Sequence, residues 1–247
     1  MSMDLATPLV MIMGLGGNRS TWRFQVPVFG KYYRVITFDN RGVGDSDKPK
    51  GSYSIRQMAD DALGLMDHLG IARSHILGAS LGGTIAQELA INYPDRVSKL
   101  ILACTYPCHD GTNGRTPEWA DAIDAFIRYR KTPSITLVAN SWPYRILGFF
   151  MLRNQYGRMD EAAREGFIAQ NEAATRHNTL DRLSMIKAST LVITGTRDKA
   201  VLPASSDTIA RLIPNSRKIE IRGGGHGFAV ENRARFNKEV LAFLKNG

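Results

Sequence analysis

Gly78-Ala79-Ser80-Leu81-Gly82 has the form G-x-S-x-G and joins two segments with contrasting patterns. Ser74–Ala79 before it has the pattern of a buried strand, and Leu81–Asn92 after it has the pattern of a helix that ends before Pro94. A sharp turn from strand to helix leaves no room beside its central residue, and glycines on both sides of Ser80 meet that demand. The stretch therefore predicts a strained turn that presents the Ser80 hydroxyl above a sheet, at the positive end of a helix.

Other apolar runs flank this turn along the chain. They are apolar on consecutive positions, which is typical of strands that are covered on both faces of a parallel sheet. We predict strands at Pro8–Met13, Tyr33–Phe38, Ser74–Ala79, Leu100–Cys104, Thr190–Thr194 and Arg217–Ile221. We predict helices at Ile55–Leu69, Leu81–Asn92, Ala204–Leu212 and Asn232–Lys245. This alternation indicates the α/β class, with a mostly parallel, doubly wound sheet.

One long segment interrupts the alternation. Between residues 105 and 187 there is no convincing strand pattern, but there are helical stretches around Glu118–Arg130 and Asp160–His177, together with many aromatic residues. We expect a small helical core here that also forms a lid over the carboxyl edge of the sheet, where α/β sheets bind ligands. The predicted organisation is a catalytic core of residues 1–104 and 188–247, with residues 105–187 as an inserted lid.

The composition excludes several classes of protein. With 43% hydrophobic and 22% charged residues, the 247-residue chain is neither disordered nor collagen-like nor a coiled coil. The net charge of +9 raises nucleic acid as a partner, but no basic run interleaved with aromatic residues supports it, so none is expected. No apolar run is long enough for a membrane span, and the default expectation is a cytoplasmic location. Cys104 and Cys108 suit neither a disulfide framework nor a zinc site, and no metal is expected.

A serine hydroxyl needs a base, and His226 is the candidate. It lies in Gly223-Gly224-Gly225-His226-Gly227, directly after the last predicted strand. Asp198 follows the strand Thr190–Thr194 and is the candidate for the acid that orients the base. Asp207 and Glu220 are nearby alternatives, but they lie within a helix pattern and a strand, and we expect them to be solvated.

Two backbone N–H groups complete a site for acyl transfer, because the reaction develops an oxyanion. One is expected from Leu81, the residue after the serine, and the other from Leu15 in the loop Gly14-Leu15-Gly16-Gly17. This glycine loop lacks the third glycine of a dinucleotide fingerprint, so a nucleotide cofactor is not expected.

These ordered motifs resemble the α/β-hydrolase superfamily over nearly the whole chain. The segment Asp39-Asn40-Arg41-Gly42-Val43-Gly44-Asp45-Ser46 is similar to that family's D-x-R-G-x-G-x-S pattern, and the order Ser80, Asp198, His226 is the family's order. The closest resemblance is to the esterase, enol-lactonase and C–C hydrolase group with a helical lid. It implies a serine hydrolase, such as a carboxylesterase, that cleaves a small ester or lactone through an acyl-enzyme on Ser80, without metal or organic cofactor. It also implies that Asp39 and Arg41 support the oxyanion loop.

The chain departs from that family in two places. Met13 stands where the family usually has histidine before the oxyanion loop. The antiparallel strands that usually precede the first parallel strand are not expected, which leaves one sheet edge uncovered. Since an uncovered edge can pair with another chain, the sequence predicts a homodimer.

Two other functions remain open at this point. The same triad can hydrolyse the C–C bond of a β-ketone or vinylogous diketone acid, and basic lid residues could then bind the substrate carboxylate. The candidates are Arg128, Arg130, Arg145, Arg153, Arg158 and Arg176. A ligand receptor built on this fold, with slow or single turnover, is the other alternative.

Overall fold

The computed structural model describes residues 7–157 and 159–245, and its centre is one sheet of six strands. Every pairing between these strands is parallel, in the order β2-β1-β3-β4-β5-β6. The strands are β1 (Leu9–Ile12), β2 (Val35–Thr37), β3 (Ser74–Ala79), β4 (Val97–Ala103), β5 (Ser189–Gly195) and β6 (Ser216–Ile221). The predicted parallel α/β sheet is confirmed, and within the described residues no antiparallel strand precedes β1.

Strand β4 begins three residues earlier than predicted, because Lys99 interrupts the apolar pattern there. This lysine is only 8% exposed. Its Nζ donates to the carbonyl oxygens of Phe243 and Leu244, each at 3.0 Å, near the carboxyl end of the last helix. A cation at the negative end of a helix is favourable, and this explains how a strand residue with a charge is buried.

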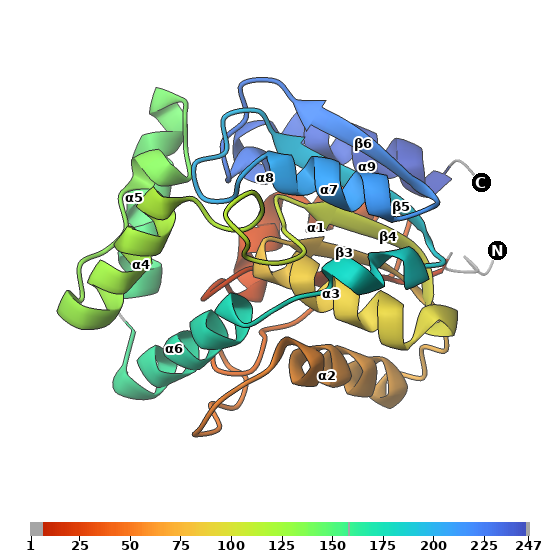
Figure 1. The fold of residues 1–247 in the computed structure, drawn as a ribbon, viewed down its shortest axis with the longest axis horizontal. Helices are drawn as coiled ribbons and strands as arrows, with labels where there is room; N and C mark the ends of the chain where they lie inside the picture. The colour runs from red at the N-terminus through yellow and green to blue at the C-terminus, as the bar shows by residue number, and fades with distance from the viewer. Residues whose placement is uncertain (1–6, 158, 246–247) are drawn as a thin grey trace.

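Helices cover both faces of the sheet (Figure 1). Alternate strand residues such as Val10 and Ile12 pack against one set of helices, and Leu9 and Met11 pack against the other. The first set is α2 (Ile55–His68), α3 (Leu81–Asn92) and α7 (Ala204–Leu212); the second is α1 (Val26–Phe29), α8 (Phe228–Glu231) and α9 (Arg233–Lys245). Short 3-10 turns η1 (Arg19–Phe24) and η2 (Pro94–Arg96) complete this part of the chain.

Residues 105–187 hold helices and no strand in their described part. The elements are α4 (Pro117–Tyr129), η3 (Ile135–Leu137), α5 (Trp142–Gly157), α6 (Glu161–Thr175) and η4 (Leu180–Met185). Helices α4, α5 and α6 lie together at one side of the molecule (Figure 1). The rings of Phe126, Tyr156 and Phe167 meet edge to face at centroid distances of 4.8 to 5.6 Å, and so give this segment a core of its own.

A buried polar cluster lies between α3 and the end of the lid segment. The Glu88 carboxylate accepts from Arg182 at 2.6 and 3.0 Å, and His177 Nδ1 lies 4.0 Å from it. The His177 side chain is 1% exposed, and burial lowers its pKa to about 4 despite the opposing effect of Glu88. His177 is therefore neutral in the folded protein over a pH range in which an unfolded histidine takes up a proton.

We expect acid to destabilise the protein through His177. The stabilising contribution is fully present above pH 6.5, the ordinary histidine pKa, and is lost as the pH falls toward 4, because the unfolded chain then binds more protons. Urea unfolding at pH 7 and pH 5 tests this. Replacing His177 with glutamine should reduce the loss of unfolding free energy between these pH values by on the order of 2 kcal/mol. Replacing the exposed His68 with glutamine should leave the loss unchanged, and equal losses in the two variants would contradict the assignment.

Candidate active site

Ser80 lies at the turn between β3 and α3 in a strained conformation. Its φ of 55° and ψ of −122° are unusual for a residue with a side chain. The backbone is held from both sides: Ser80 N–H donates to the Ala103 carbonyl oxygen at 2.9 Å, and Thr105 Oγ1 donates to the Ser80 carbonyl oxygen at 2.8 Å. The hydroxyl therefore projects from a rigid point at the carboxyl edge of the sheet.

The flanking glycines are required by close packing. A Cβ atom at Gly78 would overlap the carbonyl oxygen of Gly82, and a Cβ atom at Gly82 would overlap the carbonyl oxygen of Ile12 in β1. Both obstacles are backbone atoms, so neither can move aside without displacing the turn.

Replacing Gly82 with alanine should therefore lower the unfolding free energy by about 2 kcal/mol or more, because the turn must move away from β1. Gly64 is the matched control: it lies within helix α2, and no atom lies within 4 Å of a Cβ placed there. Alanine at position 64 should stabilise the helix by up to about 1 kcal/mol. Chemical denaturation measures both, and equal stability of the two variants would show that the turn is less constrained than its packing indicates.

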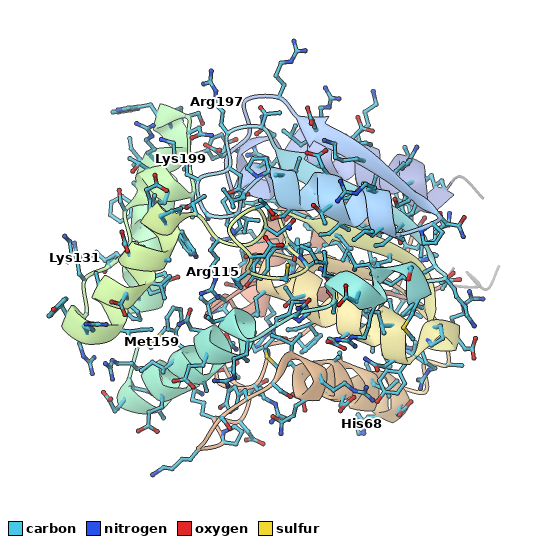
Figure 2. All side chains as sticks on the ribbon, viewed as in Figure 1. His68, Arg115, Lys131, Met159, Arg197 and Lys199 are labelled. Carbon is cyan, nitrogen blue, oxygen red and sulfur yellow. The ribbon has the colours of Figure 1, made fainter. Side chains whose placement is uncertain are left out.

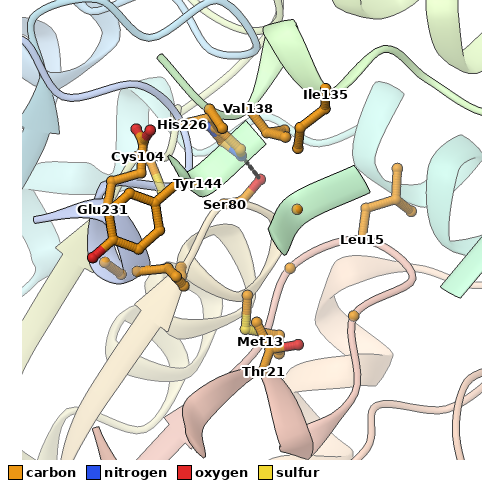
Figure 3. Close-up of a pocket in the computed structure, with 18 of the residues that line it drawn as sticks. Met13, Leu15, Thr21, Ser80, Cys104, Ile135, Val138, Tyr144, His226 and Glu231 are labelled. Carbon is orange, nitrogen blue, oxygen red and sulfur yellow. Dashed lines mark hydrogen bonds between the residues drawn. The ribbon is translucent and has the colours of Figure 1, made fainter. Parts of the chain in front are cut away.

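His226 and Asp198 complete a chain of hydrogen-bonding groups with Ser80. His226 Nε2 lies 3.1 Å from Ser80 Oγ (Figure 3), and His226 Nδ1 lies 2.9 Å from Asp198 Oδ2. The other oxygen of Asp198 accepts from the N–H groups of Ala200 and Val201 at 2.8 and 3.0 Å. A carboxylate at Nδ1 requires the proton on that nitrogen, so Nε2 faces the hydroxyl as an acceptor.

The alternative acids lie elsewhere. Asp207 and Glu220 both accept hydrogen bonds from Lys218, at 2.5 and 2.7 Å, and their side chains are more than half exposed. The Asp198 side chain is 1% exposed and directed at His226. The structure thus brings Ser80, His226 and Asp198 together and leaves the two alternatives at the surface.

The two predicted oxyanion donors belong to segments that adjoin the serine. Leu81 is the first residue of α3, and Leu15 lines the same pocket as Ser80. A Cβ atom at Gly14 would be only 3.0 Å from Ser80 Cβ, so the glycine loop packs directly against the serine. In the described part of the chain, no acceptor takes the N–H of Leu15 or Leu81. Both groups remain available to a bound oxygen atom.

The oxyanion loop is supported differently from what the resemblance implies. Asn40 Nδ2 donates to the Met13 carbonyl oxygen at 2.9 Å, while Asp39 accepts from the N–H of Arg19 at 2.6 Å. The Arg41 guanidinium pairs with Asp61 on α2 instead of with the loop. Gln170 on α6 has the supporting role that the sequence did not reveal: it accepts from Gly16 N–H at 3.1 Å and donates to the Arg41 carbonyl oxygen at 2.7 Å.

A pocket of about 190 Å³ opens above Ser80. Most of its lining is apolar, and the lid segment supplies a large part of it. The lining residues from that segment are Trp119, Ile135, Val138, Ala139, Tyr144, Gly148 and Tyr156. Figure 3 shows Leu15 on one side of Ser80, and Tyr144 and Glu231 on the other. Cys104 also lines the pocket, in a left-handed conformation with φ of 43°, and sequence reasoning missed its place beside the serine.

The lid segment is bonded directly to the loop that carries His226. Gly227 N–H donates to the Val138 carbonyl oxygen at 2.8 Å, and Asn140 Nδ2 donates to the carbonyl oxygens of Arg197 and Gly223, each at 3.3 Å. The rings of Trp119 and His226 lie 6.0 Å apart. The wall of the pocket and the histidine are therefore positioned by the same contacts.

Among the described residues, no basic side chain of the lid segment lines this pocket. Arg128 pairs with Asp124, Arg130 with Glu161 and Arg176 with Glu172, while Arg145 donates to the Ala139 carbonyl oxygen. Arg153 is exposed, and Arg158 lies outside the described residues. Other basic side chains are spread over the surface, such as Lys131 just after helix α4 and Arg197 in the loop after β5 (Figure 2).

Within residues 7–157 and 159–245, no cluster of histidine, cysteine and acidic side chains has the form of a metal site. None of the helices in this part of the chain is long and apolar enough to cross a membrane.

Known proteins share this sequence pattern and this architecture. A sequence model of the alpha/beta hydrolase fold matches residues 7–232. The chain belongs to the α/β-hydrolase family. Like its homologues that are named as hydrolases or lactonases, this α/β-hydrolase is a hydrolytic enzyme. A Caulobacter segnis protein that bears the name of a carbamate hydrolase, RutD, is 29% identical over 96% of this chain and 91% of its own length.

Two solved structures show how closely other α/β-hydrolases match. The enol-lactonase from Burkholderia xenovorans has a TM-score of 0.86 and 30% identity, with 100% of this chain and 94% of that one covered. A meta-cleavage product hydrolase from Pseudomonas fluorescens has a TM-score of 0.82 and 26% identity, and the match covers 97% of this chain and 91% of that one. These similar proteins are named for different substrates, so the substrate of this α/β-hydrolase has to be argued from its own pocket.

Proposed function

We propose that this α/β-hydrolase cleaves a small carboxylic ester or lactone through an acyl-enzyme on Ser80. The observation that carries the proposal is the continuous chain from Ser80 Oγ through His226 to Asp198, with distances of 3.1 and 2.9 Å. Ser80 Oγ attacks the acyl carbon while His226 Nε2 takes its proton. His226 then gives that proton to the leaving alkoxide, and Asp198 stabilises the imidazolium that forms between these steps.

The same groups hydrolyse the acyl-enzyme in the second half of the reaction. Water attacks the acyl carbon, His226 accepts the proton of the water, and the proton returns to Ser80 Oγ as the carboxylic acid leaves. During both acylation and deacylation, the carbonyl oxygen of the substrate acyl group becomes negatively charged. In this proposal the N–H groups of Leu15 and Leu81 donate to it. No metal or organic cofactor takes part in this proposed mechanism.

In this proposal the chain is divided into two parts. Residues 1–104 and 188–247 form the catalytic core, and residues 105–187 form the lid. The support for this division is that the lid segment supplies much of the apolar lining of the pocket, whereas Ser80, Asp198 and His226 all follow strands of the sheet. The lid would then set which acyl and alcohol groups fit.

Steady-state hydrolysis of a panel of 4-nitrophenyl esters, with a lactone and a vinylogous diketone acid beside them, tests the proposed reaction. We expect sustained multiple turnover of short esters and one acyl group on Ser80 when the reaction is quenched and analysed by mass spectrometry. Release of a single equivalent of 4-nitrophenol would favour the receptor alternative. Faster turnover of the diketone acid than of every ester would favour C–C hydrolysis, for which no lid arginine of the described residues lines the pocket.

The homodimer stays a prediction. Strand β2 forms one edge of the sheet, with β1 as its only neighbour in the described residues. Since such an edge can pair with a second copy, we propose a dimer through β2, and sedimentation of a monomer at micromolar concentration would contradict it. The cytoplasmic location is likewise a prediction from the sequence.

A further inference from the structure

Among the described residues that line the pocket, Glu231 is the acidic side chain, and no lysine or arginine is present. It is the last residue of α8, which also contributes Ala229 and Val230 to the lining. Apart from Ser80, His226 and Glu231, the lining side chains that carry nitrogen, oxygen or a thiol are Thr21, Trp22, Gln25, Cys104, Trp119, Tyr144 and Tyr156. None of them is an acid or a base of the Asp, Glu, Lys, Arg or His type. A glutamate carries a negative charge at neutral pH, so the apolar chamber holds one fixed anionic group.

The Glu231 side chain is held in place by the lid segment. Its Oε1 accepts from Asn140 N–H at 2.8 Å, from Ser141 N–H at 2.9 Å and from Ser141 Oγ at 3.1 Å. These three donors are located directly before helix α5, which supplies Tyr144 and Gly148 to the same wall. The carboxylate is therefore unable to swing out of the pocket without breaking the attachment of the lid.

A cation on the same corner, Arg233, does not enter the lining. Arg233 is exposed, and its Nη1 donates to the Tyr144 hydroxyl at 2.6 Å, with the guanidinium over the Tyr144 and Phe24 rings. Arg128, Arg130 and Arg176 of the lid segment pair with acids, and Arg145 donates to the carbonyl oxygen of Ala139. No described arginine of the lid segment is itself part of the lining. The net charge of +9 thus favours anions at the surface, while the chamber itself presents the opposite sign.

We propose that Glu231 makes this pocket selective for uncharged substrates and rejects substrates that carry a carboxylate. The proposal rests on the ester or lactone hydrolysis proposed above. Two like charges beside apolar walls repel more strongly than they would in open water, because the walls lower the local dielectric constant. A charge placed against an unwanted substrate is a recognised source of specificity. The carboxylate of Glu231 then acts as a specificity determinant, and it takes no part in bond cleavage.

Pairs of substrates that differ by one carboxylate test this proposal. On the acyl side the pair is 4-nitrophenyl hexanoate and 4-nitrophenyl hydrogen adipate; on the alcohol side it is phenyl butyrate and 4-carboxyphenyl butyrate. Each kcat/KM is divided by the rate constant for hydroxide hydrolysis of the same ester, which removes intrinsic reactivity. We expect the wild-type protein to prefer the neutral member of at least one pair by about tenfold or more.

Replacing Glu231 with glutamine removes the charge and keeps a carbonyl oxygen for the three donors. In the pair for which the wild-type protein prefers the neutral ester, the ratio of the two corrected kcat/KM values should fall by about tenfold or more. The kcat/KM for the neutral ester itself should change much less. Replacing Asn140 with alanine is the control, because it removes the neighbouring Nδ2 bonds of the lid to Arg197 and Gly223 without changing the charge of the pocket. Its effect should be equal on both members of each pair.

The possible failures are distinguishable. The role of Glu231 would be overturned if the wild-type protein preferred the neutral ester by less than about tenfold in both pairs. It would also be overturned if the glutamine variant kept the wild-type preference. Either result would leave ester hydrolysis intact. Absence of turnover of both neutral esters would overturn the proposed function and this inference together. The wild-type comparison needs no variant, so the proposal is tested even where the glutamine variant fails to fold.

Discussion

Replacing Ser80 with alanine should lower kcat for 4-nitrophenyl butyrate by roughly 10⁴- to 10⁶-fold. The alanine variant lacks the Oγ that lies 3.1 Å from His226 Nε2, and no acyl-enzyme can form. The oxyanion donors and the pocket remain, so a small residual rate over the uncatalysed reaction is expected from binding alone.

The fold should survive this replacement, because the hydrogen bonds that hold the turn come from the Ser80 backbone. Serine at position 52 provides the control, since it is exposed and lies far along the chain from the pocket-lining residues. Its replacement with alanine should leave kcat unchanged. Retention of most of the activity by the Ser80 variant, with an unchanged melting temperature, would show that the nucleophile is misassigned.

Replacing Asp198 with asparagine should lower kcat by roughly 10³- to 10⁴-fold with little change in KM. The amide is nearly the same size as the carboxylate, and its oxygen can still accept from the N–H groups of Ala200 and Val201. Its NH₂ group then faces His226 Nδ1 as a donor. This favours the tautomer with the proton on Nε2, which is the wrong one for accepting the proton of Ser80.

Asp207 is the matched control for that variant. It is also an aspartate near the end of the chain, but its carboxylate is exposed and accepts from Lys218. Replacing Asp207 with asparagine should leave both kcat and KM within about twofold of the wild-type values. A larger loss of kcat in the Asp207 variant than in the Asp198 variant would reverse the assignment of the acid.

Much of the fold was predictable because buried parallel strands leave consecutive apolar residues. Strand β3 and helix α3 have the predicted bounds. Helix α5 was not predicted, because its apolar residues are spread around the helix and include both the pocket-lining Tyr144 and the exposed Trp142.

The meeting of Ser80, Asp198 and His226 was predictable for a geometric reason: all three follow parallel strands, whose carboxyl ends share one edge of the sheet. Gln170 and Glu231 had no such signal. Their roles depend on how the lid segment packs against the core, through contacts such as the one between Gln170 and Gly16, 154 positions apart in the sequence. Single-sequence patterns report local periodicity and do not contain that information.

The hydrogen bond from Gly227 N–H to the Val138 carbonyl oxygen has a consequence for cooperativity. Because Gly227 directly follows His226, a displacement of Val138 from the pocket also removes a constraint on the histidine loop. Enclosure of a substrate and alignment of the base are therefore thermodynamically coupled: each becomes easier once the other is achieved. A ligand that fills the pocket and holds Val138 in place favours the aligned base at the same time, so the enzyme is best organised for reaction when its chamber is occupied.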